Sequence, residues 1–295
     1  MRVFLTGATG FLGAALIPEL IGAGHHVTGL VRSDAGAKVL AAARADAYHG
    51  SLEDVAGLQR GAASADAVIH CAYHHDFSQA ERSARLESQA IEALGRGVAG
   101  TGRPLIITSV SAMGAAVPGQ IATEQGYNPH NPRSATEIAG KAAAARGANV
   151  SIVRLAQVHN TVKQGFVSAL AHTARAQGVA AYVGQGANRW AAVHLLDAAR
   201  LYRLALERGE PGSVYHAVAQ EGITLRAIAE SIGRTLNLPV RSLSPEAAAA
   251  HFGWLALFAS MDMAASSANT RQLLGWAPSG PGLLSDVEHQ QPADA

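Results

Sequence analysis

The feature that most constrains the fold is a glycine-rich segment close to the start of the chain. It reads Thr6-Gly7-Ala8-Thr9-Gly10-Phe11-Leu12-Gly13, follows the apolar run Val3-Phe4-Leu5, and opens a second apolar stretch. A strand that ends at three glycines spaced three apart and then starts a helix leaves the backbone room to meet a diphosphate at the helix N-terminus. The segment therefore predicts a dinucleotide site.

The spacing is Gly-x-x-Gly-x-x-Gly rather than the more familiar Gly-x-Gly-x-x-Gly, so the context has to support the prediction. A second apolar run at 26–31 supplies the strand after which a ribose-reading side chain is expected. The alternative is an ordinary glycine-rich turn between a buried strand and a helix.

Composition narrows the class of protein and of partner. The chain has 295 residues, 48% of them hydrophobic and 15% charged, which indicates a globular protein with a substantial core. The net charge of +1, without basic runs, gives no footprint for nucleic acid or an anionic membrane, and no apolar stretch is long enough to span one. We expect a small-molecule partner.

The single cysteine, Cys71, cannot form an internal disulfide, which favours the cytoplasm.

Apolar runs alternate with helical patterns, which predicts a doubly wound parallel α/β sheet. The expected strands are 2–6, 26–31, 46–49, 66–71, 104–109 and 149–155. Later come longer helical stretches at 162–177, 194–208 and 223–236, with short strands near 180–183 and 213–218. We expect a Rossmann domain over 1–155 and a smaller, mostly helical substrate-binding part over 156–295, partly interleaved with the Rossmann sheet.

Several motifs together resemble the extended short-chain dehydrogenase/reductase family, also called the epimerase/dehydratase family. They are the glycine segment, Ala65-Asp66-Ala67-Val68-Ile69-His70-Cys71-Ala72, Ile106-Ile107-Thr108-Ser109, Val153-Arg154-Leu155, Trp190-Ala191-Ala192-Val193-His194-Leu195-Leu196-Asp197 and Leu274-Gly275-Trp276-Ala277-Pro278. The resemblance implies a Rossmann-type fold, a nicotinamide cofactor and a homodimer.

The resemblance also implies roles for individual residues. Gly7, Gly10 and Gly13 would approach the diphosphate, and Ala72 would lie beside the cofactor ribose. Ser109 matches the substrate-orienting serine, with Ser111 as a rival. The full set of expected cofactor-binding residues is Gly7, Thr9, Gly10, Phe11, Leu12, Gly13, Arg32, Ser33, Ser51, Leu52, Cys71, Ala72, Tyr73 and Lys141.

The end of the second strand bears on the choice of cofactor. An NAD-specific protein usually carries Asp or Glu there to accept hydrogen bonds from the ribose 2′-hydroxyl. This chain has Val31-Arg32-Ser33 instead. A guanidinium suits a 2′-phosphate, so we expect NADP(H) in preference to NAD(H). Gly50-Ser51-Leu52 stands where the family commonly places an aspartate next to the adenine.

The family's catalytic tyrosine is missing. It should stand four residues before a lysine, but Glu137 occupies that place before Lys141. The same spacing is typical of an ordinary helix ion pair, so Glu137 is either that partner or a catalytic base. An adjacent ammonium makes it a poor acid. Lys141 could still hold the nicotinamide ribose.

Another group must then donate the proton. Tyr73, His74, His75 and Asp76 follow the fourth strand directly, and we favour Tyr73 or His74 over Tyr127. No histidine pair has metal-ligand spacing, so we expect no metal.

We therefore expect an NADPH-dependent oxidoreductase that reduces a carbonyl or related unsaturated group of a small, fairly apolar substrate. Tyr182, Phe166, Phe252 and Trp254 could form an apolar pocket for it. The alternatives are a non-catalytic NADP(H) sensor or scaffold, and an epimerase, isomerase or lyase with bound dinucleotide.

Overall fold

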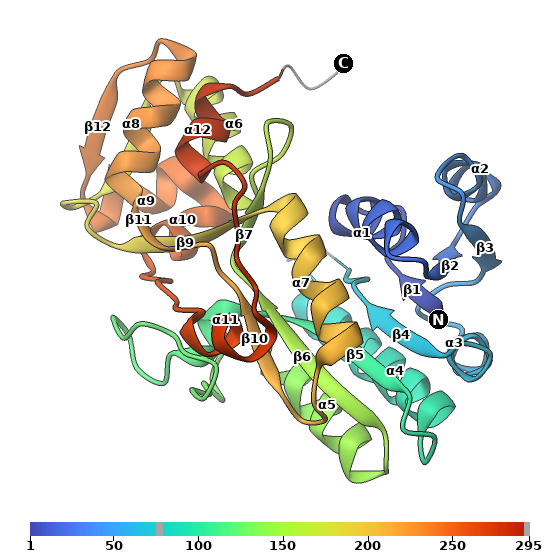
Figure 1. Cartoon of the computed structure of the whole chain (residues 1–295). Helices are drawn as coiled ribbons and strands as arrows, with labels where there is room; N and C mark the ends of the chain where they lie inside the picture. The colour runs from blue at the N-terminus through green and yellow to red at the C-terminus, as the bar shows by residue number, and fades with distance from the viewer. Residues whose placement is uncertain (75–78, 292–295) are drawn as a thin grey trace.

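The computed structural model describes residues 1–74 and 79–291. It contains a seven-stranded parallel sheet with helices on both faces (Figure 1), which confirms the expected doubly wound α/β fold. The strands lie in the order β10-β6-β5-β4-β1-β2-β3. Their bounds are β1 Arg2–Thr6, β2 His26–Val31, β3 Asp46–His49, β4 Ala67–His70, β5 Pro104–Val110, β6 Asn149–Leu155 and β10 Val214–Ala217.

Two helical layers cover this sheet, because successive side chains of each strand point to opposite faces. Leu5 and Ile106 pack on one side, and Phe4 and Ile107 on the other. The first side carries α1 (Phe11–Gly22), α2 (Asp34–Ala42) and α7 (Leu195–Arg208), and the second carries α3 (Val55–Ala63), α4 (Ala80–Val98) and α5 (Ser134–Ala145). α1 runs through Pro18 without a break.

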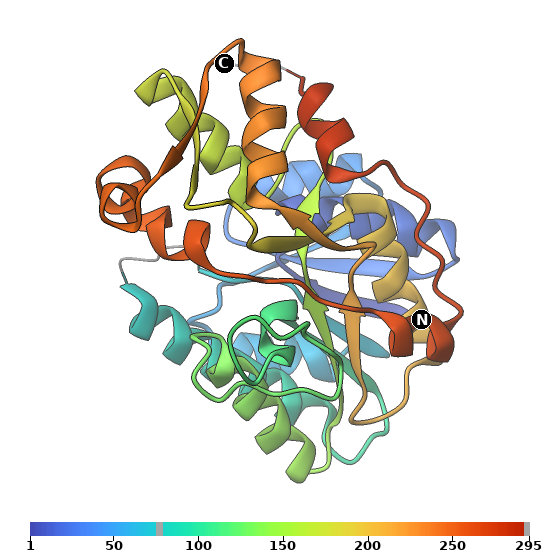
Figure 2. The same cartoon turned by 90° about the vertical axis from the view of Figure 1, so that its left-hand side faces the viewer.

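The second part of the chain has its own core, in which Trp190 is fully buried. A three-stranded sheet and a two-stranded sheet line it: β7 Gln157–His159, β9 Arg189–His194 and β11 Gln220–Thr224, and β8 Ala180–Val183 with β12 Val240–Leu243. The helices are α6 Phe166–Gln177, α8 Leu225–Leu236, α9 Pro245–Phe252, α10 Ala256–Ser260, α11 Ala268–Leu274 and α12 Leu283–Glu288. Figure 2 shows α6, α8 and α12 gathered at the top, away from teal α4 and green α5.

Two elements of the second half return to the first sheet. α7 packs on α1, and β10 pairs with β6 as the edge strand. Trp276, in the Leu-Gly-Trp-x-Pro segment, is buried and donates a hydrogen bond from Nε1 to the Asp197 carbonyl at the start of α7, 3.0 Å away. The range 156–295 thus contributes to both cores. None of the helices in the described residues combines the length and apolarity that a membrane crossing requires.

Candidate functional site

The glycine positions at the junction of β1 and α1 leave little or no room for a side chain. Gly7 has φ +73°, and a Cβ on it would lie 2.8 Å from the Ala72 backbone nitrogen. A Cβ on Gly10 would lie 3.1 Å from the Gly7 carbonyl oxygen, and one on Gly13 would collide with that same oxygen. The loop therefore keeps its shape and its approach to the end of β4 only with glycine at these positions.

The N-terminus of α1 is open to an anion. Its N-cap is Gly10, so no side chain caps the helix, and no acidic residue stands in the first turn. The amide N–H groups of the first turn, where Phe11 and Leu12 lie, have no partners within the helix, and the helix dipole places partial positive charge there. Together with the crowded glycines beside it, this geometry fits a diphosphate.

The ends of β2 and β3 lie next to this loop. A Cβ on Gly36 would lie 3.6 Å from the Thr9 side chain, and the Gly50 amide donates to the Val31 carbonyl at 2.9 Å. Arg32 is exposed between them. Ser33 caps α2 by accepting from the Gly36 amide at 3.3 Å.

The two residues after Gly50 are also held locally. The Ser51 hydroxyl accepts from the Glu53 amide at 3.2 Å, and Leu52 packs against the core beneath α3 and α4. Because the Gly50 amide joins β2, the structure brings Ser51 and Leu52 to the same edge as the glycine loop.

Cys71 and Ala72 directly follow β4, beside the end of β1. The Ala72 amide donates to the Thr6 hydroxyl at 3.3 Å, and Thr108 donates to the Cys71 sulfur at 3.6 Å. Burial raises the pKa of the Cys71 thiol to about 12. The thiol therefore stays protonated, and Cys71 packs at this edge of the sheet as a small apolar side chain.

Ser109 lies at the carboxyl end of β5 and is almost fully buried, at 1% exposure. Thr108 bonds Tyr202 of α7 at 2.7 Å, so Ser109 points to the opposite face, toward α4 and α5. Its hydroxyl has no hydrogen-bond partner among the described residues. A buried hydroxyl without a partner is available to a ligand oxygen.

His70 shares this face. Its Nδ1 is hydrogen-bonded to the Thr6 hydroxyl at 2.7 Å, while its Nε2 is buried and finds no partner in residues 1–74 and 79–291. Burial, with the charge of Arg133 nearby, lowers the pKa of His70 to about 3. His70 is therefore neutral near pH 7.

The expected proton donors lie next to this point. Tyr73 packs its ring under the guanidinium of Arg133, 3.8 Å from the centroid, and the His74 Nδ1 is hydrogen-bonded to the Ser83 hydroxyl at 3.1 Å. His75 and Asp76 lie outside the described residues. The structure thus places Tyr73 beside Arg133, a residue that the sequence did not single out.

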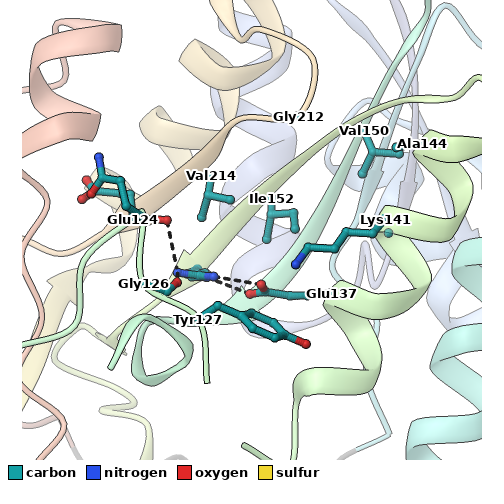
Figure 3. Close-up of a pocket in the computed structure, with 13 residues that line it drawn as sticks. Glu124, Gly126, Tyr127, Glu137, Lys141, Ala144, Val150, Ile152, Gly212 and Val214 are labelled. Carbon is teal, nitrogen blue, oxygen red and sulfur yellow. Dashed lines mark hydrogen bonds and ion pairs between the residues drawn. The ribbon is translucent and has the colours of Figure 1, made fainter. Parts of the chain in front are cut away.

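Glu137 forms its ion pair with Arg154 and not with Lys141, so the interpretation of Glu137 as the helix partner of Lys141 is wrong. Both Glu137 oxygens accept from Arg154 in β6, at 2.7 and 2.8 Å, and the two side chains are 1% and 2% exposed (Figure 3). A guanidinium matches a carboxylate in this two-pronged way, whereas an ammonium does not. Glu137 is committed to a buried pair and does not reach the glycine loop.

Lys141 lies on a different part of the molecule from the cofactor residues. Its ammonium sits over the Tyr127 ring at 4.1 Å, at a cavity of about 160 Å³ that Val150, Gly212 and Val214 also line (Figure 3). Val150 is next to the amino end of β6, whereas the glycine loop and Ser109 are at the carboxyl ends of their strands. The structure therefore does not bring Lys141 to the dinucleotide site.

The four aromatic residues expected to form an apolar pocket lie in the second part of the chain. Phe166 and Trp254 meet edge to face at 5.9 Å. Phe252 is buried in the core of the second part, and Phe166 and Tyr182 both pack against that core. The Tyr182 ring also lies near Arg226.

Comparisons with known proteins agree with this architecture. The family model of the RmlD substrate binding domain matches residues 1–253. The structure of DesIV, a dTDP-glucose 4,6-dehydratase from Streptomyces venezuelae with NAD and TYD bound, has a TM-score of 0.79 at 20% identity and covers 98% of this chain and 96% of that one. The chain belongs to the epimerase/dehydratase family. Members of this family are oxidoreductases, epimerases or dehydratases, and the resemblance seen in the sequence is confirmed.

Two relatives are similar to this chain in sequence, one over nearly its whole length and one over about a quarter of it. An uncharacterised protein of Schizosaccharomyces pombe is 45% identical over 290 residues, which are 97% of this chain and 98% of that one. A decarboxylating sterol-4-alpha-carboxylate 3-dehydrogenase of Dictyostelium discoideum is 46% identical over 71 residues, 24% of this chain and 22% of that one.

Proposed function

We propose that this family member is an NADPH-dependent oxidoreductase that reduces a carbonyl or related unsaturated group of a small, fairly apolar substrate. The observation that carries the proposal is the position of Ser109 and Tyr73. A buried hydroxyl that has no partner within residues 1–74 and 79–291 and a phenol stand at the carboxyl ends of β5 and β4, next to a glycine loop shaped for a diphosphate. The partial similarity to the Dictyostelium sterol-4-alpha-carboxylate 3-dehydrogenase supports the same reaction class.

The charge at the end of β2 supports NADP(H). Arg32 is exposed beside the loop, and Asp34, the next carboxylate along the chain, stands in the first turn of α2 at 3.9 Å from His49. A guanidinium can bind a 2′-phosphate in a forked geometry and repels no anion. Arg32 and Ser33 are therefore assigned to the 2′-phosphate, with NAD(H) as the weaker ligand.

A bound nicotinamide would supply the hydride. On the protein side, the first-turn amides of α1 hold the diphosphate, Ser109 donates a hydrogen bond to the substrate's carbonyl oxygen, and Tyr73 gives that oxygen its proton. The His74 Nδ1 is hydrogen-bonded to Ser83, and Tyr73 is preferred as the donor because its ring lies against Arg133, which bonds the strand that carries Ser109. Solvent then returns a proton to Tyr73. General acid catalysis of this kind contributes about 10²- to 10⁴-fold in rate.

Calorimetric titration with NADP⁺, NADPH, NAD⁺ and NADH tests the cofactor assignment. The wild type should bind NADPH more tightly than NADH, and Arg32→Glu should reverse that order. Arg60→Glu, an exposed arginine at the end of α3, is the matched control and should leave the order unchanged. A protein that binds none of the four dinucleotides would end the oxidoreductase proposal.

A non-catalytic sensor of the NADP(H) ratio is the second candidate. The burial of Glu137 in its pair with Arg154 favours it, because the helix that carries catalysis in the family then has no free acid or base at that position. A ratio sensor must bind the two redox forms with different affinity. Equal affinity for NADP⁺ and NADPH, or turnover of a carbonyl panel, would exclude it.

A further inference from the structure

Arg133 is held rigidly at the N-cap of α5. Its Nη2 donates to Glu87 of α4 at 2.8 Å and to the Thr108 carbonyl of β5 at 3.1 Å. Glu87 is in turn fixed by the Thr136 hydroxyl at 2.8 Å, and the Arg133 and Glu87 side chains are 16% and 4% exposed. The guanidinium therefore has one orientation and is largely shielded from water.

That orientation sets the guanidinium over the ring of a phenol. Its central carbon lies 3.8 Å from the Tyr73 ring centroid, and its Nε is buried without a hydrogen-bond partner in the described part of the chain. Tyr73 directly follows Ala72, whose backbone touches the glycine loop, and Arg133 bonds the residue before Ser109. The cation thus contacts Tyr73 and the backbone carbonyl next to Ser109, the second group assigned to the substrate.

A guanidinium in this place has a chemical consequence. It keeps its charge at every accessible pH and is planar, so it stacks on an aromatic ring. Charge interactions are stronger in a site that water does not screen. The positive charge against the ring, offset in part by its ion pair with Glu87, favours the phenolate that remains after proton donation, and the contact limits how far the ring can turn.

We propose that Arg133 is the positioning residue for Tyr73, orienting its phenol and stabilising the phenolate formed when Tyr73 protonates the substrate oxygen. This inference rests on the proposed function. The reductant is a reduced nicotinamide dinucleotide: its hydride forms the new C–H bond, the carbonyl π bond breaks, and the Tyr73 proton goes to the oxygen. The cation and the phenol come from two separate segments, the N-cap of α5 and the residues after β4.

The variants are Arg133→Met, which removes the charge, and Arg133→Lys, which keeps a partner for Glu87 but cannot stack as a plane. Arg146→Met, at the exposed C-cap of the same helix, is the matched control. The first readout needs neither cofactor nor substrate. Phenolate absorbance at 295 nm is followed against pH, and the same titration in a Tyr73→Phe background is subtracted to isolate the Tyr73 signal.

We expect the Tyr73 phenolate signal to move to higher pH in Arg133→Met, because the cation that lies over the ring is then absent. Arg133→Lys should lie between that variant and wild type, and Arg146→Met should match wild type. An unchanged signal in both Arg133 variants would overturn the inference and leave Arg133 as a clamp between α4 and α5. If Arg133→Met does not fold, Arg133→Lys against wild type decides by the same criterion.

Kinetics separate this inference from the proposed function. With an active carbonyl substrate, Arg133→Met should lower kcat by about 10²-fold or more and shift its pH profile in the direction of the absorbance change, while affinity for NADPH is retained. A shifted absorbance with no turnover of any carbonyl by the wild type would remove the proposed function alone. Turnover that is independent of Arg133 would remove the inference alone.

Discussion

Replacing Glu137 with glutamine should destabilise the protein severely. The substitution keeps the size of the side chain but removes the negative charge opposite Arg154, which is 2% exposed. Both carboxylate oxygens of Glu137 accept hydrogen bonds from Arg154, but the glutamine side chain has only one oxygen. Its amide group is a donor and would face the guanidinium, which is also a donor. Arg154 would remain buried with only neutral partners, the carbonyls of Thr123 and Gly126 among them.

Breaking a buried pair from one side costs about 3–5 kcal/mol, because the remaining charge stays buried without its counterion. This is a large share of the roughly 5–15 kcal/mol by which a folded protein exceeds its unfolded state. The measurement is urea unfolding at pH 7, followed by circular dichroism, for wild type and Glu137→Gln. The midpoint should fall sharply, with or without cofactor.

Glu92→Gln is the matched control. Glu92 is on α4, is 39% exposed, and contacts Arg96 and Arg146 at 3.7 Å, so its loss should cost about 0–1 kcal/mol. If the two variants lost the same free energy of unfolding, the interpretation of Glu137 as the counterion of Arg154 would be refuted. Retained stability with lost turnover would instead point to a catalytic role.

Three further outcomes are expected. Gly7→Ala should abolish dinucleotide binding in calorimetry and cost about 2 kcal/mol or more in urea unfolding, because φ is +73° and the methyl would meet the Ala72 backbone. Lys141→Met should leave the affinity for all four dinucleotides unchanged, and any marked loss would contradict its placement over Tyr127. Burial lowers the pKa of His70 from 6.5 to about 3, so below pH 6.5 the unfolded chain binds a proton that the folded chain does not bind. The contribution of His70 to the free energy of unfolding is therefore full above pH 6.5. It falls by about 1.4 kcal/mol per pH unit below that value, or about 2 kcal/mol at pH 5. Urea unfolding at pH 7 and 5 should show a shallower decrease for His70→Asn than for wild type, and an equal decrease would contradict the burial argument.

The sheet could be predicted because its signals are local. Each strand is a short apolar run bounded by turn residues. The glycines at 7, 10 and 13 are required by contacts within their own loop or with the residues that follow β4. The cofactor role of Lys141 is implied only by the family resemblance, and a spacing of four on a helix does not say which face of the helix meets the cofactor.

The partners of the two buried arginines could not be read from spacing. Glu137 lies 17 residues from Arg154, and Glu87 lies 46 from Arg133, so only the packing of helices on the sheet brings them together. One signal was present. A charged residue inside the apolar run Val153-Arg154-Leu155 must have a buried counterion, and Glu137 is a carboxylate on the helix that immediately precedes this strand.

The edge strand β10 has a consequence for how the chain can be divided and how it folds during synthesis. Residues 1–155 end at β6, whose outer side is completed only when Val214–Ala217 arrive. Until then the nascent chain exposes an apolar strand with an unpaired edge. Arg154 in this strand also lacks the His216 imidazole, which lies 3.3 Å from it in the folded protein. Such an edge is a template for pairing with another chain. A fragment cut at the apparent domain boundary should therefore aggregate, whereas one that extends through β10 keeps the edge covered.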